Sequence, residues 1–320
     1  MTLSTRVTEL LGVREPIIQA GMSVHTSPEL VAAVSNAGGL GLVGSVFREP
    51  DDLRAIVRAV QGLTDRPFGA NIVLAEPWDA YLEILLDLGV PVISTSWGDP
   101  AAVVERARTV GALVMHQVES VGEVAGAVAA GVDIIVAQGG DGGGHIGRVG
   151  TLALVPAVVD AAGGVPVVAA GGIADGRGLA AALLLGAEGV LIGTRFLATV
   201  EAPVPEGWKS SLLAAKPEDA WQTDLPDVLD EHAWPGATVR VLANRPVRDW
   251  HGQDAAIVAN REQIRADLER AWQAGDAEGF FVYAGQSAGL VHEMLPAGEV
   301  VRRIVVEAAM ALRGAVSLLE

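Results

Sequence analysis

The 320-residue chain contains no cysteine. This absence excludes disulfides, thiolate nucleophiles and cysteine-ligated zinc or iron–sulfur sites, and no metal site is predicted. The N-terminal stretch MTLSTRVTELLGV has no apolar core of the kind found in secretory leaders. The most apolar stretch, residues 152–170, is interrupted by prolines, glycines and Asp160, which indicates helix, turn and strand and no membrane span. We therefore expect a cytoplasmic protein.

Basic and aromatic residues are also scarce. The chain has 22 Lys and Arg against 39 Asp and Glu, a formal net charge of −17 at pH 7. Such an acidic chain is ill suited to the phosphates of nucleic acids or to an anionic membrane surface, so neither is expected as a partner. Aromatic residues make up only 4% of a composition that is 50% hydrophobic. A core built mainly from Ala, Val, Leu and Ile is typical of parallel sheets with covering helices.

The first 200 residues alternate between short β-branched runs and longer amphipathic stretches rich in Ala and Leu. This alternation predicts βαβ units and a parallel sheet. Eight strands separated by helices are the number that closes a (β/α)8 TIM barrel, a fold of the α/β class. An open, doubly wound sheet is the alternative. The predicted strands lie near Ile17–Gln19, Leu40–Val43, Phe68–Val73, Val92–Thr95, Ala112–Gln117, Ile134–Ala137, Val167–Ala170 and Val190–Ile192.

The character of the sequence changes after Thr199. Residues 201–275 contain six prolines and five of the seven tryptophans. We interpret this stretch as a mostly helical insertion after the eighth strand, serving as a lid or as the surface of a homodimer. The predicted organisation is a barrel over residues 1–200, the insertion over residues 201–275, and a C-terminal segment over residues 276–320. In that last segment a helix from Pro296 to Leu319 is expected to return to the barrel.

The active sites of βα barrels lie at the carboxyl ends of the strands. The seventh predicted strand ends in Gly171 and Gly172, a pair that lets the backbone approach an anion closely. The eighth strand ends in Gly193 and Thr194, where the loop offers further N–H groups. The loops after strands seven and eight form the usual phosphate site of this fold, so a phosphate-bearing ligand is expected. The plain alternative is that these glycines only make tight turns.

Amide and imidazole side chains follow other strands. Asn71, Gln117 and Gln138 each donate and accept hydrogen bonds, which suits the mixed edge of an isoalloxazine ring. Taken singly, each is commonly a satisfied polar residue at a sheet end. His145 follows the run GGDGGG on the loop after strand six, and histidine can move a proton or hold an anion near neutral pH. The alternative role for His145 is that of a surface loop histidine.

Together these features resemble the nitronate monooxygenase family, formerly called 2-nitropropane dioxygenases. The resemblance rests on PIIQAGM at 16–22, VSNAGGLG at 34–41, FGANIVL at 68–74, VMHQV at 114–118, AQGGDGGGHIG at 137–147, AAGGIADGRGLAAALLLGAEGVLIGTRFLAT at 169–199 and YAGQSAGL at 283–290. These pieces follow one another along the whole chain. Enoyl-acyl-carrier-protein reductases of the FMN type are similar in the same motifs, including a GGHIG-like loop.

The resemblance implies FMN as the cofactor and His145 as the catalytic residue. Gln117 matches a position where some relatives carry lysine near the flavin. With Gln117 and the glycine pair included, the predicted cofactor-binding residues are Met22, Asn71, Gln117, Gln138, Gly143, Gly171, Gly172, Leu191, Ile192, Gly193 and Thr194.

The resemblance also implies an activity, the FMN-dependent oxidation of alkyl nitronates and of nitroalkanes. In this reaction O2 completes the conversion of a small-molecule substrate to a carbonyl compound and nitrite. An NAD(P)H-dependent FMN reductase of an enoyl thioester or quinone is an alternative that the family motifs do not separate. A non-redox isomerase or aldolase that binds a sugar phosphate is a third. No lysine lies at the end of a predicted strand, so Schiff-base chemistry would lack its nucleophile.

Overall fold

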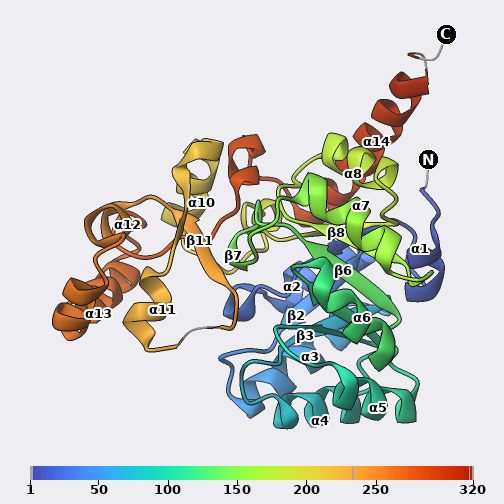
Figure 1. Cartoon of the computed structure of the whole chain (residues 1–320), viewed down its shortest axis with the longest axis horizontal. Coiled ribbons are helices and arrows are strands. Elements are labelled where there is room, and N and C mark those ends of the chain that lie inside the picture. Colours follow the sequence, from blue (N-terminus) through green and yellow to red (C-terminus); the bar gives the residue numbers. More distant parts are fainter. Residues whose placement is uncertain (1–2, 233, 317, 319–320) are drawn as a thin grey trace.

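The computed structural model describes residues 3–232, 234–316 and 318. Eight parallel strands close into a barrel, with β1 paired to both β2 and β9 (Figure 1). The eight predicted strands are confirmed to within one residue at each end, and the open sheet is excluded. The barrel strands are β1 (Ile17–Gln19), β2 (Leu40–Gly44), β3 (Phe68–Val73), β4 (Val92–Ser96), β5 (Leu113–Val118), β6 (Ile134–Gln138), β8 (Val167–Ala170) and β9 (Val190–Ile192).

Helices follow the strands and cover the outside of the barrel (Figure 1). The first of them shows why they begin and end where they do. The Ser27 side chain accepts a hydrogen bond from the Leu30 N–H at 3.0 Å, and Gly38 ends the helix in the left-handed region at φ 103°. The helices of the barrel are α2 (Pro28–Ala37), α3 (Pro50–Leu63), α4 (Asp79–Asp87), α5 (Ala101–Val110), α6 (Val121–Ala130), α7 (Thr151–Ala161), α8 (Gly176–Leu184) and the short α9 (Thr194–Leu197).

The core has two layers because the strands are buried on both faces. The larger layer lies between the strands and the helices, where alternate strand residues such as Ile17 and Ile135 meet the apolar faces of the helices. The smaller layer fills the barrel interior, with Ile18 and Leu42 among its members. Helix α1 (Arg6–Leu11) packs against this interior layer and closes the end of the barrel where the strands begin. The opposite end, where the strands finish, holds the large cavity described below.

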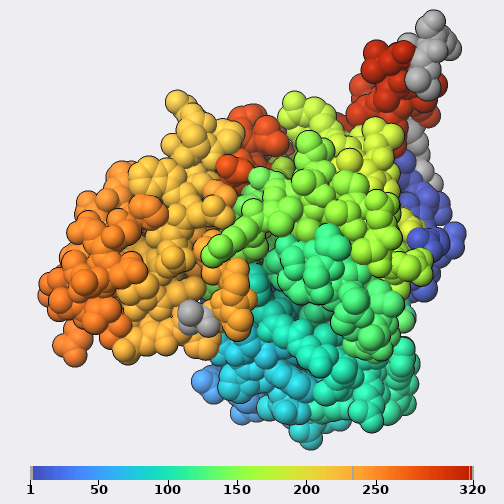
Figure 2. All heavy atoms as spheres, viewed as in Figure 1, coloured from blue at the N-terminus to red at the C-terminus, as the bar shows by residue number. Residues whose placement is uncertain are grey.

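The insertion forms a lobe beside the barrel (Figures 1 and 2). It is mostly helical, with its own core that includes Leu229, Val239 and Ile257. It also contains an antiparallel sheet, in the order β10, β11, β7, which sequence analysis did not predict. Its third strand, β7 (Gly144–Ile146), comes from the barrel loop that carries His145. The other elements are α10 (Glu206–Ala214), β10 (Ala220–Thr223), α11 (Leu225–Asp230), β11 (Thr238–Leu242), α12 (Arg245–Trp250) and α13 (Asp254–Ala274).

The C-terminal helix α14 (Ala297–Val316) packs against α2 and α8. A Cβ added to Gly176 would lie only 2.3 Å from the backbone nitrogen of Ala308, so the two helices touch along their backbones. The predicted end of this helix, Leu319, lies outside the described residues. Among the helices of the described ranges, none is long and apolar enough to cross a bilayer. The division at residues 200 and 275, and the homodimer, stay predictions.

Candidate functional site

A cavity of about 360 Å³ lies at the carboxyl ends of the barrel strands. Residues at or just beyond the ends of all eight strands line it, and short segments from elsewhere complete its wall. The insertion contributes Trp234, and the segment after the insertion contributes Tyr283 and Ser287. Both the barrel and the chain that follows it therefore form the wall of the cavity.

All twelve residues predicted for the site line this one cavity. They come from widely separated parts of the chain, and the closure of the barrel brings them together. Their roles in cofactor binding and catalysis stay predictions. They are Met22, Asn71, Gln117, Gln138, Gly143, His145, Gly171, Gly172, Leu191, Ile192, Gly193 and Thr194.

The glycines present bare backbone to the cavity. Gly171 and Gly172 have φ angles of 97° and 74°, which residues with a side chain rarely adopt. A Cβ on Gly171 would lie 2.6 Å from the carbonyl oxygen of Gly139. A Cβ on Gly143 would lie 2.4 Å from the carbonyl carbon of Ala284. Side chains are thus excluded from this part of the wall, which leaves the close backbone approach that a phosphate group needs.

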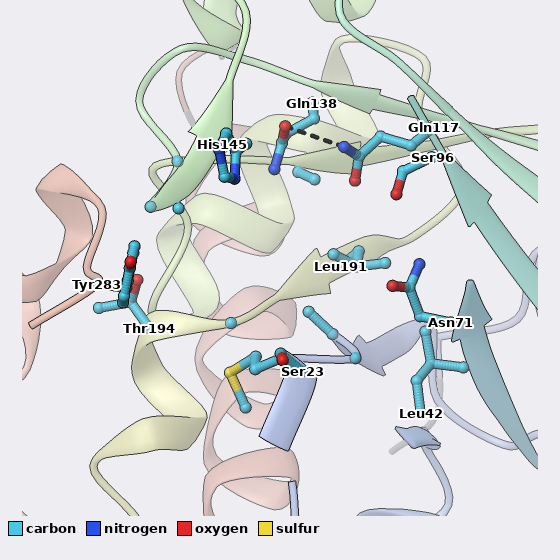
Figure 3. A pocket seen from close by; sticks show the side chains of 18 of the residues that line it. Ser23, Leu42, Asn71, Ser96, Gln117, Gln138, His145, Leu191, Thr194 and Tyr283 are labelled. Carbon is cyan, nitrogen blue, oxygen red and sulfur yellow. Dashed lines mark hydrogen bonds between the residues drawn. The ribbon is translucent and has the colours of Figure 1, made fainter. Parts of the chain in front are cut away.

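Amide groups line another part of the wall (Figure 3). Gln117 Nε2 donates to Gln138 Oε1 at 3.0 Å and to Oε1 of Glu119 at 2.8 Å. Asn71 Nδ2 donates to the carbonyl oxygen of Ser94 at 3.4 Å, which leaves its Oδ1 for the cavity. The wall therefore offers both donors and acceptors, the mixture that a heterocyclic ring edge requires.

His145 is held by two residues of the insertion. Its Nε2 lies 2.9 Å from Asp227 Oδ1, and its ring stacks on Trp234 with centroids 3.7 Å apart and planes 23° apart. An ionised carboxylate only accepts hydrogen bonds, so Nε2 carries a proton in this pair. Within the described ranges Nδ1 has no hydrogen-bond partner, and it is the nitrogen left for a substrate. His145 is thus part of a strand paired with β11 and is not on the surface loop that was the alternative.

The rest of the wall is close to neutral. Of the described residues that line the cavity, none is Arg, Lys, Asp or Glu. Burial lowers the pKa of His25 to about 4, helped by the charge of Arg48, so this lining histidine is uncharged near neutral pH. Burial raises the pKa of Tyr283, and nearby carboxylates add to the effect, so its phenol keeps its proton. A substrate therefore meets His145 against a largely uncharged background.

Backbone strain gathers at the rim of the cavity. Ser23, Phe47 and Trp97 all have positive φ, at 51°, 64° and 59°, although none is glycine. All three line the cavity, and Phe47 remains 67% exposed. Residues in this region persist only where the surrounding structure imposes the conformation, and they cluster at functional sites. The rim thus shows the strain typical of a binding site.

Four residues that line the cavity or hold His145 were not predicted from the sequence. Asp227 lies in LPDVLD, which carries no motif, and it is 82 positions from its partner histidine. Trp234 lies in the tryptophan-rich insertion, which the sequence indicated as a lid or as a homodimer surface. Tyr283 stood within the quoted motif YAGQSAGL without a role. Trp97 directly follows β4, where the rule that sites lie at strand ends would have found it.

Comparisons with known proteins show a matching family and several similar chains. A family model described as "Nitronate monooxygenase" matches residues 4–78 and 72–307. The chain is 33% identical over 359 residues to a Mycobacterium tuberculosis "(3aS,4S,5R,7aS)-5-hydroxy-7a-methyl-1-oxo-octahydro-1H-indene-4-carboxyl-CoA dehydrogenase", with 100% of both chains covered. It is 33% identical to a "Probable nitronate monooxygenase" of Staphylococcus saprophyticus, covering 92% of this chain and 95% of the other. The structure of FabK from Thermotoga maritima has a TM-score of 0.90 and 37% identity, over 99% of this chain and 100% of that one.

Proposed function

We propose that this chain, which belongs to the nitronate monooxygenase family, binds FMN in the cavity and oxidises small alkyl nitronates with O2. It is an enzyme of the FMN-type oxidoreductases, since its relatives include a nitronate monooxygenase and a dehydrogenase. The observation that carries the proposal is the placement of His145. A proton-exchanging side chain faces a cavity whose wall suits a flavin phosphate on one part and a flavin ring on another.

The donor set of the cavity fits FMN. Gly171, Gly172 and Gly193 form a side-chain-free wall suited to the phosphate. Asn71, Gln117 and Gln138 supply donors and acceptors for the polar edge of the ring. Met22, Leu191 and Ile192 add apolar surface to the cavity wall. When bound, FMN would supply the electron acceptor that no side chain of this chain can provide.

His145 would hold the substrate and manage its proton. With the proton of Nε2 directed at Asp227, the lone pair of Nδ1 can accept the carbon-bound proton of a neutral nitroalkane. The same nitrogen, once protonated, can donate a hydrogen bond to a nitronate oxygen. Trp234 keeps the ring in this orientation by stacking on it. The buried, apolar wall around these groups would limit the access of water.

An anaerobic visible spectrum of the FMN-loaded protein tests the proposal. We expect propionate 3-nitronate to reduce the flavin absorbance, and His145→Ala to slow that reduction at least tenfold. His251→Ala is the matched control, because His251 is exposed and remote from the cavity. A protein that takes up no FMN, or a His145→Ala variant that reacts as fast as the wild type, would contradict the proposal.

A reductase or dehydrogenase of an acyl thioester is the second candidate. It is favoured by the uncharged, aromatic rim of the cavity, where Trp97 lies 6.1 Å from Trp234 between ring centroids. Such a rim suits an apolar carbon skeleton better than a small anion. The similarity to a CoA-thioester dehydrogenase supports the same alternative. In the anaerobic titration, bleaching by NADH without bleaching by the nitronate would identify this activity.

A further inference from the structure

Glu119 is a buried acid that the proposed chemistry leaves unused. It directly follows β5, is 6% exposed and does not line the cavity. Gly147 makes room for it, because a Cβ there would lie 2.6 Å from Glu119 Cβ. Across the described ranges no Lys, Arg or His forms an ion pair with Glu119, and its carboxyl instead accepts a hydrogen bond from Gln117.

The carboxyl of Glu119 is neutral near neutral pH. Burial raises its pKa to about 9; the hydrogen bond from Gln117 opposes this shift, and Glu123 adds to it. Glu123 lies in the first turn of α6 and accepts a hydrogen bond from the Glu119 backbone N–H at 3.1 Å. The Glu119 oxygen that faces Gln117 is Oε1, which accepts a hydrogen bond from it.

Counting hydrogen bonds at Gln117 then fixes its orientation. The amide nitrogen Nε2 has two hydrogens. One is donated to Glu119 Oε1 at 2.8 Å and the other to Gln138 Oε1 at 3.0 Å. Both hydrogens are used within the protein, so Gln117 can present only its oxygen to the cavity.

The orientation of Gln138 follows from that of Gln117. Its oxygen is occupied by Gln117, so its nitrogen is the atom that remains. Figure 3 shows both free atoms, Gln117 Oε1 and Gln138 Nε2, directed toward the open centre of the cavity. Neither has a hydrogen-bond partner elsewhere in the part of the chain that the structure describes.

We propose that Glu119 is a positioning residue that acts through Gln117 to fix the polarity of the cavity wall, so that an amide oxygen of Gln117 and an amide N–H of Gln138 face the flavin ring. We call Glu119, Gln117 and Gln138 the amide relay. Its function toward the flavin rests on the proposed FMN site. The orientation of the two amides does not, because it follows from contacts within the protein.

Two substitutions of Glu119 separate this proposal from a merely structural role. Glu119→Gln keeps the relay, because a glutamine can accept from Gln117 with its side-chain oxygen. Glu119→Leu has a similar volume but removes the acceptor, which frees Gln117 to rotate. The loss of one hydrogen bond corresponds to roughly a threefold to tenfold change in affinity.

The experiment measures the FMN dissociation constant by quenching of flavin fluorescence. We expect Glu119→Gln to bind FMN within twofold of the wild type and Glu119→Leu to bind it about threefold to tenfold more weakly. The flavin of Glu119→Gln should also show an unchanged ratio of oxidised to reduced form against a reference dye. Equal binding by all three proteins, equal loss in both variants, or a tenfold change of that ratio in Glu119→Gln would overturn the proposal.

A second measurement needs no flavin and remains valid if Glu119→Leu does not fold. The side-chain amide signals of Gln117 and Gln138 should keep their NMR positions in Glu119→Gln. Movement of both signals would overturn the relay. A wild type that fails to bind FMN would instead refute the proposed function, while these two signals still decide the relay.

Discussion

Replacing Asp227 with Asn is the sharpest perturbation of the candidate site. Asp227 Oδ1 lies 2.9 Å from His145 Nε2, and both side chains are largely buried, at 12% and 18% exposed. A hydrogen bond involving a charged group contributes about 1.5–3 kcal/mol. If the bond orients His145 in the transition state, its loss should lower kcat/KM by about tenfold to a hundredfold. Because Asp227 does not line the cavity, the FMN content should not change.

The assay is O2 consumption with propionate 3-nitronate, alongside FMN content and thermal unfolding. Asp230→Asn is the matched control, since Asp230 lies on the same helix and its side chain is 66% exposed. In a His145→Ala background, Asp227→Asn should have no further effect, because the two residues act as one unit. The reasoning is refuted if Asp227→Asn retains kcat/KM within twofold, or if it lowers the rate equally with and without His145.

Three further predictions concern the cavity wall and its titratable groups. Gly172→Ala should weaken FMN binding more than tenfold, because φ there is 74° and the new Cβ would lie 3.1 Å from Asp141 Cβ. Trp234→Ala should lower the free energy of unfolding by about 3–5 kcal/mol, since the ring is 8% exposed, and should slow turnover through His145. Burial lowers the pKa of His25 and of His116 to about 4. The unfolded chain then binds more protons between pH 4 and 6.5, so each histidine lowers the free energy of unfolding by about 1.4 kcal/mol for each pH unit of acidification there.

Each of these predictions has a control substitution or a result that would contradict it. Gly164→Ala introduces a Cβ at φ 97° outside the cavity, so it should strain the backbone without affecting FMN binding. Trp221→Ala removes a ring that is 40% exposed and should cost far less stability than Trp234→Ala. Glu119 acts against the histidines, because its raised pKa of about 9 means stability is lost as pH rises from 4.5 through 9. Urea unfolding that shows no stability maximum near pH 6.5 would contradict these pKa shifts.

The barrel and its cavity could be predicted because their signals are local. Each strand is a short β-branched run, and the strand-end rule then brings Asn71, Gln138 and Gly172 to one place. The sequence patterns that would indicate the small sheet of β10, β11 and β7 are weaker. Gly144–Ile146 has no alternation and only three residues, and it becomes a strand only because β11 pairs with it. The sequence TVRVL of β11 does alternate, but it lies in a segment that prolines and tryptophans marked as irregular.

The orientation of side chains could not be predicted, because it depends on partners that are distant in the sequence. His145 was predicted from its glycine-rich surroundings, but its usable nitrogen is set by Asp227 on another lobe. Gln117 and Gln138 were predicted from strand ends, but the atoms they present depend on Glu119, whose burial no local pattern reveals. Sequence patterns thus located the groups of the site, and the tertiary contacts determine what those groups can donate or accept.

The separation between barrel and insertion explains why the cofactor is easier to infer than the substrate. The wall suited to FMN comes from the barrel, through glycines and amides at strand ends that the family motifs contain. The aromatic rim of the cavity comes from elsewhere. Trp234 belongs to the insertion, and Phe47 and Trp97 belong to strained rim positions outside the quoted motifs. If this rim selects the substrate, a change of substrate class leaves the proposed flavin site of the barrel intact. Substitutions at Trp97 and Trp234 should accordingly change substrate preference before they change FMN affinity.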